Sequence, residues 1–337
     1  MTLLGRWDGS MNLEGIDHRM LGRDLLKRVS RSFYLSMRFL PGAMREPVSL
    51  GYLLARASDT IADTEVAPIM VRRDCLARFR ESLPETRPDF PEFYAEVIRE
   101  FSPRQSHEGE RELLQRLPDL FGWLTGMDSQ NRAAVIDVLR EITIGQAWDL
   151  ERFGEAEEAT PVACCETAEE LETYAYRVAG CVGAFWTRVG FLNLGDRFAE
   201  PALAEVMTGD GIAMGKGLQL VNILRDTGED LRQGRCYLPR AELKAAGWDD
   251  ESSLPSNAIL LAVAETWRHR CREWLSQGWQ YVAALRRGRV RFATALPLIL
   301  AEATLDGIEA AGERALTEKI KVSRSEVRKA MFRSLWC

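Results

Sequence analysis

The stretch at residues 222–239 reads Asn-Ile-Leu-Arg-Asp-Thr-Gly-Glu-Asp-Leu-Arg-Gln-Gly-Arg-Cys-Tyr-Leu-Pro. It spaces Asn222, Asp226 and Asp230 four residues apart, so a helix would carry all three on one face. The residues just before it, 214–221, are largely apolar, which predicts that this face enters a buried part of the protein. Carboxylates in such a place are paired with cations or bound to a metal ion.

A second acidic pair lies far upstream, where residues 56–63 read Arg-Ala-Ser-Asp-Thr-Ile-Ala-Asp. Arg56, Asp59 and Asp63 again fall on one helix face. Either pair alone is also typical of a solvated helix. Together, in apolar surroundings and beside arginine, the two pairs indicate a site for Mg2+ and a phosphorylated ligand. Mg2+ bridges carboxylates to phosphate oxygens, and the planar guanidinium of arginine binds phosphate directly.

The composition, 337 residues with 46% hydrophobic, allows a large core. A formal net charge of −6 argues against a nucleic-acid binder. The 7 cysteines have no framework or metal-ligand spacing, which favours reduced thiols. No signal peptide is recognised, and the longest uncharged apolar run, residues 292–301, is half of the roughly 20 residues that a membrane span needs. We therefore expect a cytoplasmic protein, soluble or peripheral at the inner membrane face.

Apolar residues at three-and-four spacing predict a protein built from helices, and strand-type alternation is nearly absent. The predicted helices are 21–38, 48–63, 133–153, 168–192, 201–231, 257–285 and 294–314. Residues 82–104, which hold four prolines, and 154–161 are interpreted as connections. We expect one all-α domain over residues 20–330, with residues 1–19 as an N-terminal extension.

Two short features each allow two interpretations. Gly228, inside the second acidic helix, costs about 1 kcal/mol relative to alanine in a helix interior. It either ends or kinks the helix there, or it lets a metal ion or diphosphate approach closely. The basic run at 286–291 is interpreted as a solvated loop, and the alternative is attraction to anionic lipid.

Two further segments carry candidate ligand-binding side chains. Tyr174 opens a glycine-containing stretch, and its hydroxyl is either satisfied in the core or close enough to a diphosphate to donate or relay a proton. Ser30 and Arg31 suit phosphate oxygens, and the ring of Phe33 could stabilise a carbocation. The alternative for these three is a polar helix end with ordinary core aromatics.

These motifs, taken in order, resemble those of the squalene and phytoene synthase family. The matches are Ser-Arg-Ser-Phe at 30–33, Arg-x-x-Asp-Thr-x-x-Asp at 56–63, Tyr-x-x-x-Val-Ala-Gly-x-Val-Gly at 174–183, Asn-Ile-Leu-Arg-Asp-x-x-Glu-Asp at 222–230 and Gly-Arg-x-Tyr-Leu-Pro at 234–239. The resemblance covers about residues 20–330. It implies a single-domain, all-α isoprenoid synthase bundle with a central active-site cavity, and head-to-head joining of two prenyl diphosphates.

The resemblance also implies a role for each matched residue. Mg2+ would be held by Asp59, Asp63, Asp226, Glu229 and Asp230. Substrate would be bound by Ser30, Arg31, Phe33, Arg56, Gln219, Asn222, Arg225 and Arg235, with the arginines on diphosphate. Tyr174 matches the tyrosine usually assigned to proton transfer or to assistance of ionisation. Ala62 departs from the glutamate of similar eukaryotic squalene synthases, so one carboxylate fewer is expected.

Within the family, residues 295–305 and 319–324 look most like squalene synthases, of the bacterial type. This implies two farnesyl diphosphates as substrates, presqualene diphosphate as intermediate, and NADPH as reductant for squalene. Lys321 and Arg324 would contact NADPH phosphates, and a solvated helix end is the alternative for both. No Gly-x-Gly-x-x-Gly stretch exists, so NADPH would not bind as in a Rossmann fold.

Three other functions remain open. A family member without the reductive step would make presqualene diphosphate, dehydrosqualene or phytoene. A non-catalytic relative would act in protein assembly, although such relatives tend to lose acidic motif residues that stand here. A terpene cyclase is a further alternative, but the segments at 174–183 and 234–239 do not resemble one. An apolar C30 product would also favour peripheral contact with a membrane.

Overall fold

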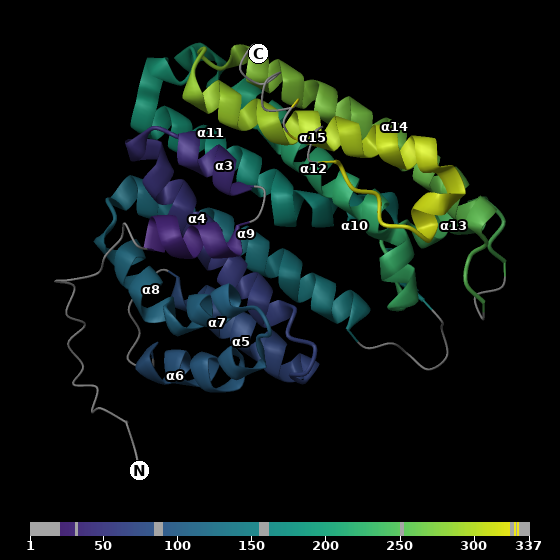
Figure 1. The fold of residues 1–337 in the computed structure, drawn as a ribbon, viewed down its shortest axis with the longest axis horizontal. Helices are drawn as coiled ribbons and strands as arrows, with labels where there is room; N and C mark the ends of the chain where they lie inside the picture. The colour runs from purple at the N-terminus through teal and green to yellow at the C-terminus, as the bar shows by residue number, and fades with distance from the viewer. Residues whose placement is uncertain are drawn as a thin grey trace.

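The computed structural model describes residues 21–30, 33–83, 90–154, 162–249, 253–323, 327 and 329. Within these residues the chain is almost entirely helical, as predicted (Figure 1). The α-helices are α2 (Leu26–Val29), α3 (Phe33–Phe39), α4 (Gly42–Ala62), α5 (Ile69–Ser82), α6 (Phe90–Glu100), α7 (Glu108–Gln115), α8 (Leu117–Gly126), α9 (Ser129–Phe153), α10 (Ala168–Ala175), α11 (Cys181–Leu194), α12 (Ala204–Arg232), α13 (Arg240–Ala245), α14 (Asn257–Ala284) and α15 (Arg289–Ala311). The predicted extension at residues 1–19 lies outside the described part.

Short elements complete the fold. Two are π-helical turns, η1 (Leu21–Leu25) and η3 (Tyr176–Gly180), and four are 3₁₀ turns, η2 (Ser102–Arg104), η4 (Gly195–Arg197), η5 (Pro201–Leu203) and η6 (Gly312–Leu316). Two-residue strands β1 (Ala163–Cys164) and β2 (Arg235–Cys236) pair in parallel. They are too short for strand-type alternation to reveal them in the sequence. Their pairing nevertheless decides where residues 235–237 lie.

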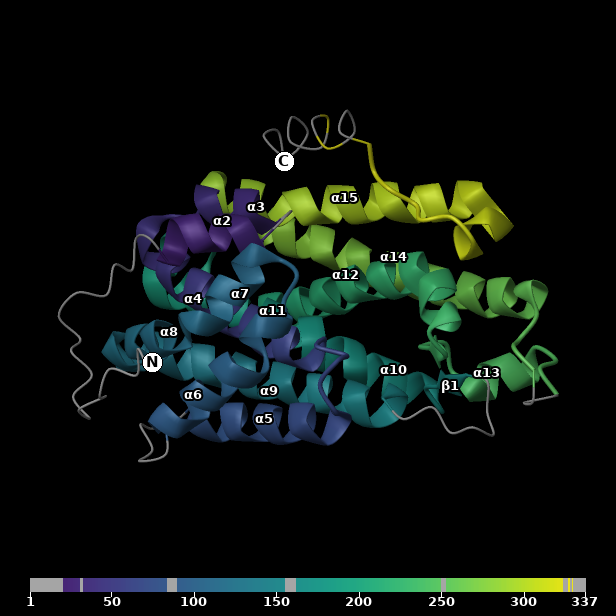
Figure 2. The ribbon, with the colours of Figure 1, turned by 60° about the horizontal axis from the view of Figure 1, so that its bottom comes forward.

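The long helices lie in layers. In Figure 2, α15 lies over α14 and α12 on one side, while α9 and α5 lie on the other. Helix α12 packs against both α11 and α14, and α4 packs against α9. One continuous core of buried side chains runs through these helices, including Leu53 and Leu54 of α4 and Leu139 of α9. The two acidic motifs therefore occupy helices that the core holds rigidly.

Glycines let α12 approach its neighbours closely. A Cβ atom added to Gly183 of α11 would lie 1.8 Å from the carbonyl oxygen of Gly211. One added to Gly215 would lie 2.2 Å from the carbonyl oxygen of Ala179 in η3. No side chain fits at either contact, so backbone touches backbone. The glycines of the 174–183 segment thus allow close approach of the helices.

Several predicted helix boundaries were wrong. Residues 21–38 do not form one helix, because α2 ends at Val29 and Ser30 adopts an extended conformation. The predicted helix 168–192 is α10 and α11 joined by η3. The predicted connection at 82–104 contains α6, and α5, α7, α8 and α13 were not predicted. Their apolar faces are short, so periodicity is a weak signal there.

The basic run at 286–291 is only partly a loop. Helix α15 begins within it, at Arg289, instead of at residue 294. The backbone of Arg286 donates to the carbonyl of Phe198, and Arg291 donates to the carbonyl of Leu285. Backbone carbonyls thus accept hydrogen bonds from two arginines of the run, although Arg286 and Arg289 remain exposed.

Gly228 does not end its helix, and its surroundings give it another role. Helix α12 continues past it to Arg232, so the glycine marks no helix end. A Cβ atom at this position would lie 1.8 Å from the carbonyl oxygen of Leu316 in η6. The glycine therefore makes room for the backbone of a segment that is distant in sequence, and not for a metal ion or diphosphate.

Candidate active site

The first acidic motif lies at the end of α4. Arg56 forms ion pairs with Asp59, one turn later, and with Glu110 of α7. Asp63 follows the helix as its C-terminal cap. The Asp59 side chain is 39% accessible to water, yet burial is the largest cause that raises its pKa. Both observations hold together if the carboxylate lines a recess that water enters and protein surrounds.

Gln146 of α9 contacts the first acidic motif from a different helix. Its side chain hydrogen-bonds to Asp59, while its own carbonyl oxygen is buried and has no partner within the described part of the chain. The sequence analysis did not identify Gln146 or Glu110. Both come from helices other than α4, so no spacing within the 56–63 motif could have indicated them.

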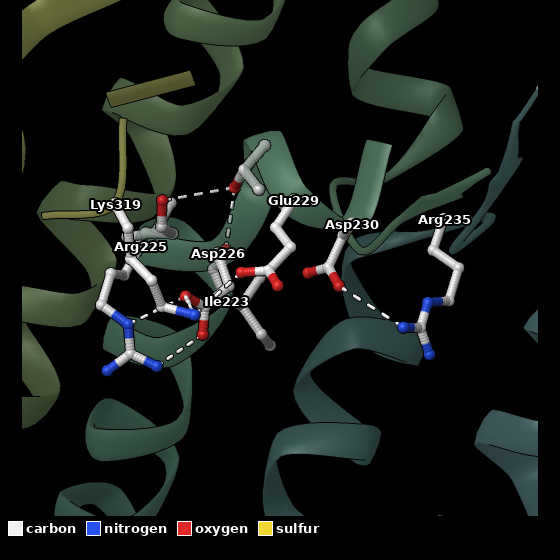
Figure 3. Close-up of polar contacts among 9 residues, drawn as sticks. Ile223, Arg225, Asp226, Glu229, Asp230, Arg235 and Lys319 are labelled. Carbon is white, nitrogen blue, oxygen red and sulfur yellow. Dashed lines mark hydrogen bonds and ion pairs between the residues drawn. The ribbon is translucent and has the colours of Figure 1, made fainter. Parts of the chain in front are cut away.

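The second acidic motif occupies the last turns of α12 (Figure 3). Arg225 Nε donates to Asp226 Oδ1 at 3.0 Å. Lys319 Nζ donates to Glu229 Oε2 at 2.8 Å and lies 3.8 Å from Asp226 Oδ1. All three carboxylates of the motif thus have cations near them, because Arg235 of β2 approaches the third.

Arg235 and Lys319 reach the motif from elsewhere in the chain. Arg235 Nη2 lies 4.0 Å from Asp230 Oδ1, held there by the pairing of β2 with β1. Lys319 follows η6 and crosses back over α12 (Figure 3). It belongs to the basic strip 319–324 of the sequence, from which only Lys321 and Arg324 were singled out. The two basic residues that follow it, at 321 and 324, were the available signal.

The two acidic motifs share one electrostatic environment. Burial first, and then repulsion from Asp59 and Asp149, raise the pKa of Asp63 to about 7. Burial, followed by Asp226 and Asp149, raises the pKa of Asp230 to about 6, although Arg235 opposes this shift. A single carboxylate, Asp149 of α9, acts on both motifs. The acidic ends of α4 and α12 therefore face a common space.

Asp149, on a third helix, is an acidic residue of the site that neither motif indicated. Tyr237 Oη donates to Asp149 Oδ1 at 2.6 Å. The ring of Tyr237 stacks on that of Tyr174, with centroids 5.1 Å apart and planes inclined by 21°. Asp149 lies three residues after Gln146 in a predicted helix, so the two polar side chains share a face. That spacing is a signal in the sequence for a polar face of this helix.

The other predicted site residues differ in their position and burial. Gln219 and Asn222 lie on α12 ahead of the motif, and Asn222 is exposed. Ser30 is buried at the end of α2, and its hydroxyl donates to the carbonyl of Leu26, so its predicted role as a phosphate ligand stays a prediction. Lys321 is exposed. Arg31, Arg324 and the side chain of Phe33 lie outside the described residues.

The carboxylates of the two motifs suit Mg2+ only if other oxygens complete its coordination. Within the described ranges, no group of three or more His, Cys, Asp or Glu side chains could hold a metal ion. The carboxylates instead form one pair on α4 and a triplet of neighbours spread along α12. Mg2+ needs six oxygens and takes the rest from water and phosphate. These residues therefore fit Mg2+ ions that bind together with a diphosphate. Such ions would compete with Lys319 and Arg225 for the carboxylates.

A family model described as squalene/phytoene synthase matches residues 26–326. The chain belongs to the squalene/phytoene synthase family. A 15-cis-phytoene synthase of Synechocystis sp. is 28% identical over 86% of the chain and 75% of its own length. A squalene synthase of Gibberella zeae is 28% identical over 91% of the chain but 62% of its own length. Phytoene synthase 1 of Solanum lycopersicum is 34% identical over 47% of the chain and 38% of its own length.

Solved structures share the fold of this family member. TcSQS in complex with the ligand E5700 superposes with a TM-score of 0.75 at 23% identity, over 95% of this chain and 86% of that one. A dehydrosqualene synthase in complex with ligand gives a TM-score of 0.66 at 20% identity, over 94% and 95% of the chains. These likenesses confirm the predicted all-α isoprenoid synthase fold. Among the helices of the described residues, none combines the length and apolarity needed to cross a membrane.

Proposed function

We propose that this family member is a squalene synthase, which joins two farnesyl diphosphates head to head to presqualene diphosphate and then reduces this to squalene with NADPH. The observation that carries the head-to-head step is the shared environment of the two acidic motifs. The charge of Asp149 raises the pKa of both Asp63, at the end of α4, and Asp230, on α12. Two diphosphates could therefore be held over one space. Each motif also has its own arginine.

The residues of the chain would divide the work of the first step. Bound Mg2+, held by Asp59 and Asp63 and by Asp226, Glu229 and Asp230, would neutralise the departing diphosphate. Arg56, Arg225 and Arg235 now pair with carboxylates, and they would turn part of their donor set to phosphate oxygens. The second prenyl chain would attack the allylic cation, which the bound chains themselves would shield from water. Lys321 and Arg324 would contact the phosphates of NADPH.

A second candidate within the same class ends without reduction and yields dehydrosqualene or, from a C20 substrate, phytoene. Two observations favour it. Phytoene synthases are among the relatives of the chain. The basic strip expected to serve NADPH has its first lysine engaged with the α12 carboxylates. A non-catalytic relative and a terpene cyclase have no comparable support from the site.

Incubation of the purified protein with farnesyl diphosphate and Mg2+, with and without NADPH, separates these candidates. We expect mass spectrometry of the extracted lipids to find squalene only when NADPH is present. A C30 diphosphate or dehydrosqualene regardless of NADPH would favour the second candidate. If farnesyl diphosphate gives nothing and geranylgeranyl diphosphate gives phytoene, the C15 assignment is wrong. Inactivity with both substrates would contradict the proposed enzyme activity.

We further propose that the protein works in the cytoplasm and touches the inner membrane face through one basic patch. Burial, and then the charges of Arg23 and Arg289, lower the pKa of Arg45, so three guanidinium groups from three elements lie near one another. Phe39, at the end of α3, is 38% exposed and packs edge-on against Phe292. Cations around an exposed aromatic ring suit the surface of an anionic bilayer.

Sedimentation with lipid vesicles tests the membrane contact. We expect the protein to bind vesicles that contain anionic lipid and not vesicles of neutral lipid alone. Replacing Arg23 and Arg289 together by glutamine should weaken binding by roughly 30-fold, since each arginine near the surface contributes about 1 kcal/mol. The same exchange at Arg270 and Arg272 of α14 is the control. Equal binding by both double variants would contradict the patch.

A further inference from the structure

The strongest feature outside the assigned roles is the carboxylate of Asp149. It lies on α9 between the two acidic motifs, and burial is the largest cause that raises its pKa. In the part of the chain that the structure describes, no lysine or arginine forms an ion pair with it, and Arg235 acts on it only as a more distant charge. Tyr237 donates a hydrogen bond to it. A buried carboxylate without a directly paired cation is costly, so a functional reason is expected.

The directions of the hydrogen bonds make the carboxylate of Asp149 an acceptor of protons. A carboxylate can only accept, so the single hydroxyl proton of Tyr237 points at Asp149 Oδ1. The hydroxyl of Tyr174 is hydrogen-bonded within the same group, to Tyr237 and Asp149. The phenol oxygens therefore keep lone pairs available while their protons face the carboxylate. Burial raises the pKa of both tyrosines well above its usual value, so neither ionises unaided.

The position of this group ties it to the reaction space. Gln146, one turn before Asp149 on α9, contacts Asp59 of the first motif. Arg235, two residues before Tyr237, approaches Asp230 of the second motif. The ring of Trp148 lies 5.3 Å from that of Tyr174 and adds a further aromatic face. Electron-rich rings and phenol oxygens beside two diphosphate sites suit a cationic hydrocarbon.

We propose that Asp149 is the final proton acceptor of the reaction whenever no hydride reaches the rearranged cation. The C–H bond next to the cationic carbon breaks, and its electron pair becomes a new C=C bond. The hydroxyl oxygen of Tyr237 or Tyr174 takes that proton while its own proton moves to Asp149. Nothing is oxidised or reduced in this step, so no co-reactant is needed. From a C30 cation the product is a conjugated triene.

This inference rests on the proposed function, because the cation arises from the head-to-head product. Asp149 acts through a tyrosine and is a positioning residue in this sense. Its carboxylate decides which way the hydroxyl protons point and where the released proton ends. Squalene formation with NADPH does not require it, because hydride capture releases no proton from the substrate. The two endings of the reaction should therefore respond differently to its removal.

The test supplies presqualene diphosphate and Mg2+ directly, which bypasses the first condensation. Without NADPH we expect the wild-type protein to form the triene. Asp149→Asn should lower the rate of triene formation by about 10²-fold, the usual size of a lost general base. The cation should then be captured by water, so that C30 alcohols replace the triene. Tyr237→Phe should shift the product ratio in the same direction, and with NADPH present both variants should lose more triene than squalene.

Asp137→Asn is the matched control, because Asp137 is an exposed carboxylate on the same helix. It should leave both the rate and the product ratio unchanged, and thermal unfolding should show that all variants fold. An unchanged triene-to-alcohol ratio in Asp149→Asn would overturn the inference, as would an equal fall of triene and squalene. Wild-type protein that turns presqualene diphosphate into squalene but never into triene would also overturn it. Failure to use presqualene diphosphate at all would contradict the proposed function as well.

Discussion

Asp226→Asn is expected to lower the rate of head-to-head condensation by about 10³-fold. Asparagine keeps the shape of the side chain but removes the charge that would help to bind Mg2+ at the second motif. Metal-ion stabilisation of a departing diphosphate contributes several kcal/mol, and about 1.4 kcal/mol corresponds to a tenfold change in rate. Asp226 already has Arg225 and Lys319 beside it, so the variant also leaves these cations with less negative charge. The measurement is steady-state turnover of farnesyl diphosphate at saturating Mg2+.

Two additional measurements separate loss of the metal from loss of the fold. Titration of Mn2+ into the protein with a non-reactive diphosphate should show weaker metal binding in Asp226→Asn. Glu205→Gln, which changes an exposed carboxylate in the first turn of the same helix, should leave turnover and metal binding unchanged. Near-normal turnover in Asp226→Asn would remove Asp226 from the proposed metal ligands.

Gly183→Ala is expected to lower the free energy of unfolding by about 2 kcal/mol. The new methyl group would lie 1.8 Å from the carbonyl oxygen and 2.2 Å from the carbonyl carbon of Gly211. Both are backbone atoms, so α11 and α12 have to separate, and overpacking of this kind costs about 1–3 kcal/mol or more. The better helix propensity of alanine, about 1 kcal/mol, offsets only part of this cost. Thermal unfolding should show a melting temperature roughly 3 °C below wild type.

Gly209→Ala provides the matched control for this prediction. Gly209 lies on α12, two residues before Gly211, and a Cβ atom there would meet nothing within 4 Å. Its substitution should leave the melting temperature unchanged or raise it slightly. If both glycine variants melt at the same temperature, the close contact of α11 and α12 does not limit stability. Retained activity in Gly183→Ala at low temperature would show that the site survives when the helices are forced apart.

The carboxylates of the site could be predicted because they follow local rules. Asp59 with Asp63, and Asp226 with Asp230, are spaced so that any helix places each pair on one face. Their helices, α4 and α12, have long apolar patterns, which is where periodicity is most informative. The all-α fold follows from the same signal, repeated along the chain.

The partners of those carboxylates could not be predicted in this way. Glu110 meets Arg56 across 54 residues of sequence, Asp149 meets Tyr237 across 88, and Lys319 meets Glu229 across 90. Each contact depends on how separate elements pack, and the sequence around either residue contains no record of the other. Gly228 illustrates the same limit, because the backbone of Leu316 that excludes a side chain there is contributed by a different segment.

Helical spacing alone was thus sufficient to identify the two acidic motifs and the helical class of the fold. Packing of α9 between α4 and β2 placed Asp149 and its tyrosines in the site, and the chain after α15 placed Lys319 on the α12 carboxylates. The difference is one of range. Periodicity acts over a few residues through the geometry of one helix, whereas burial and charge act through space and require the assembled core.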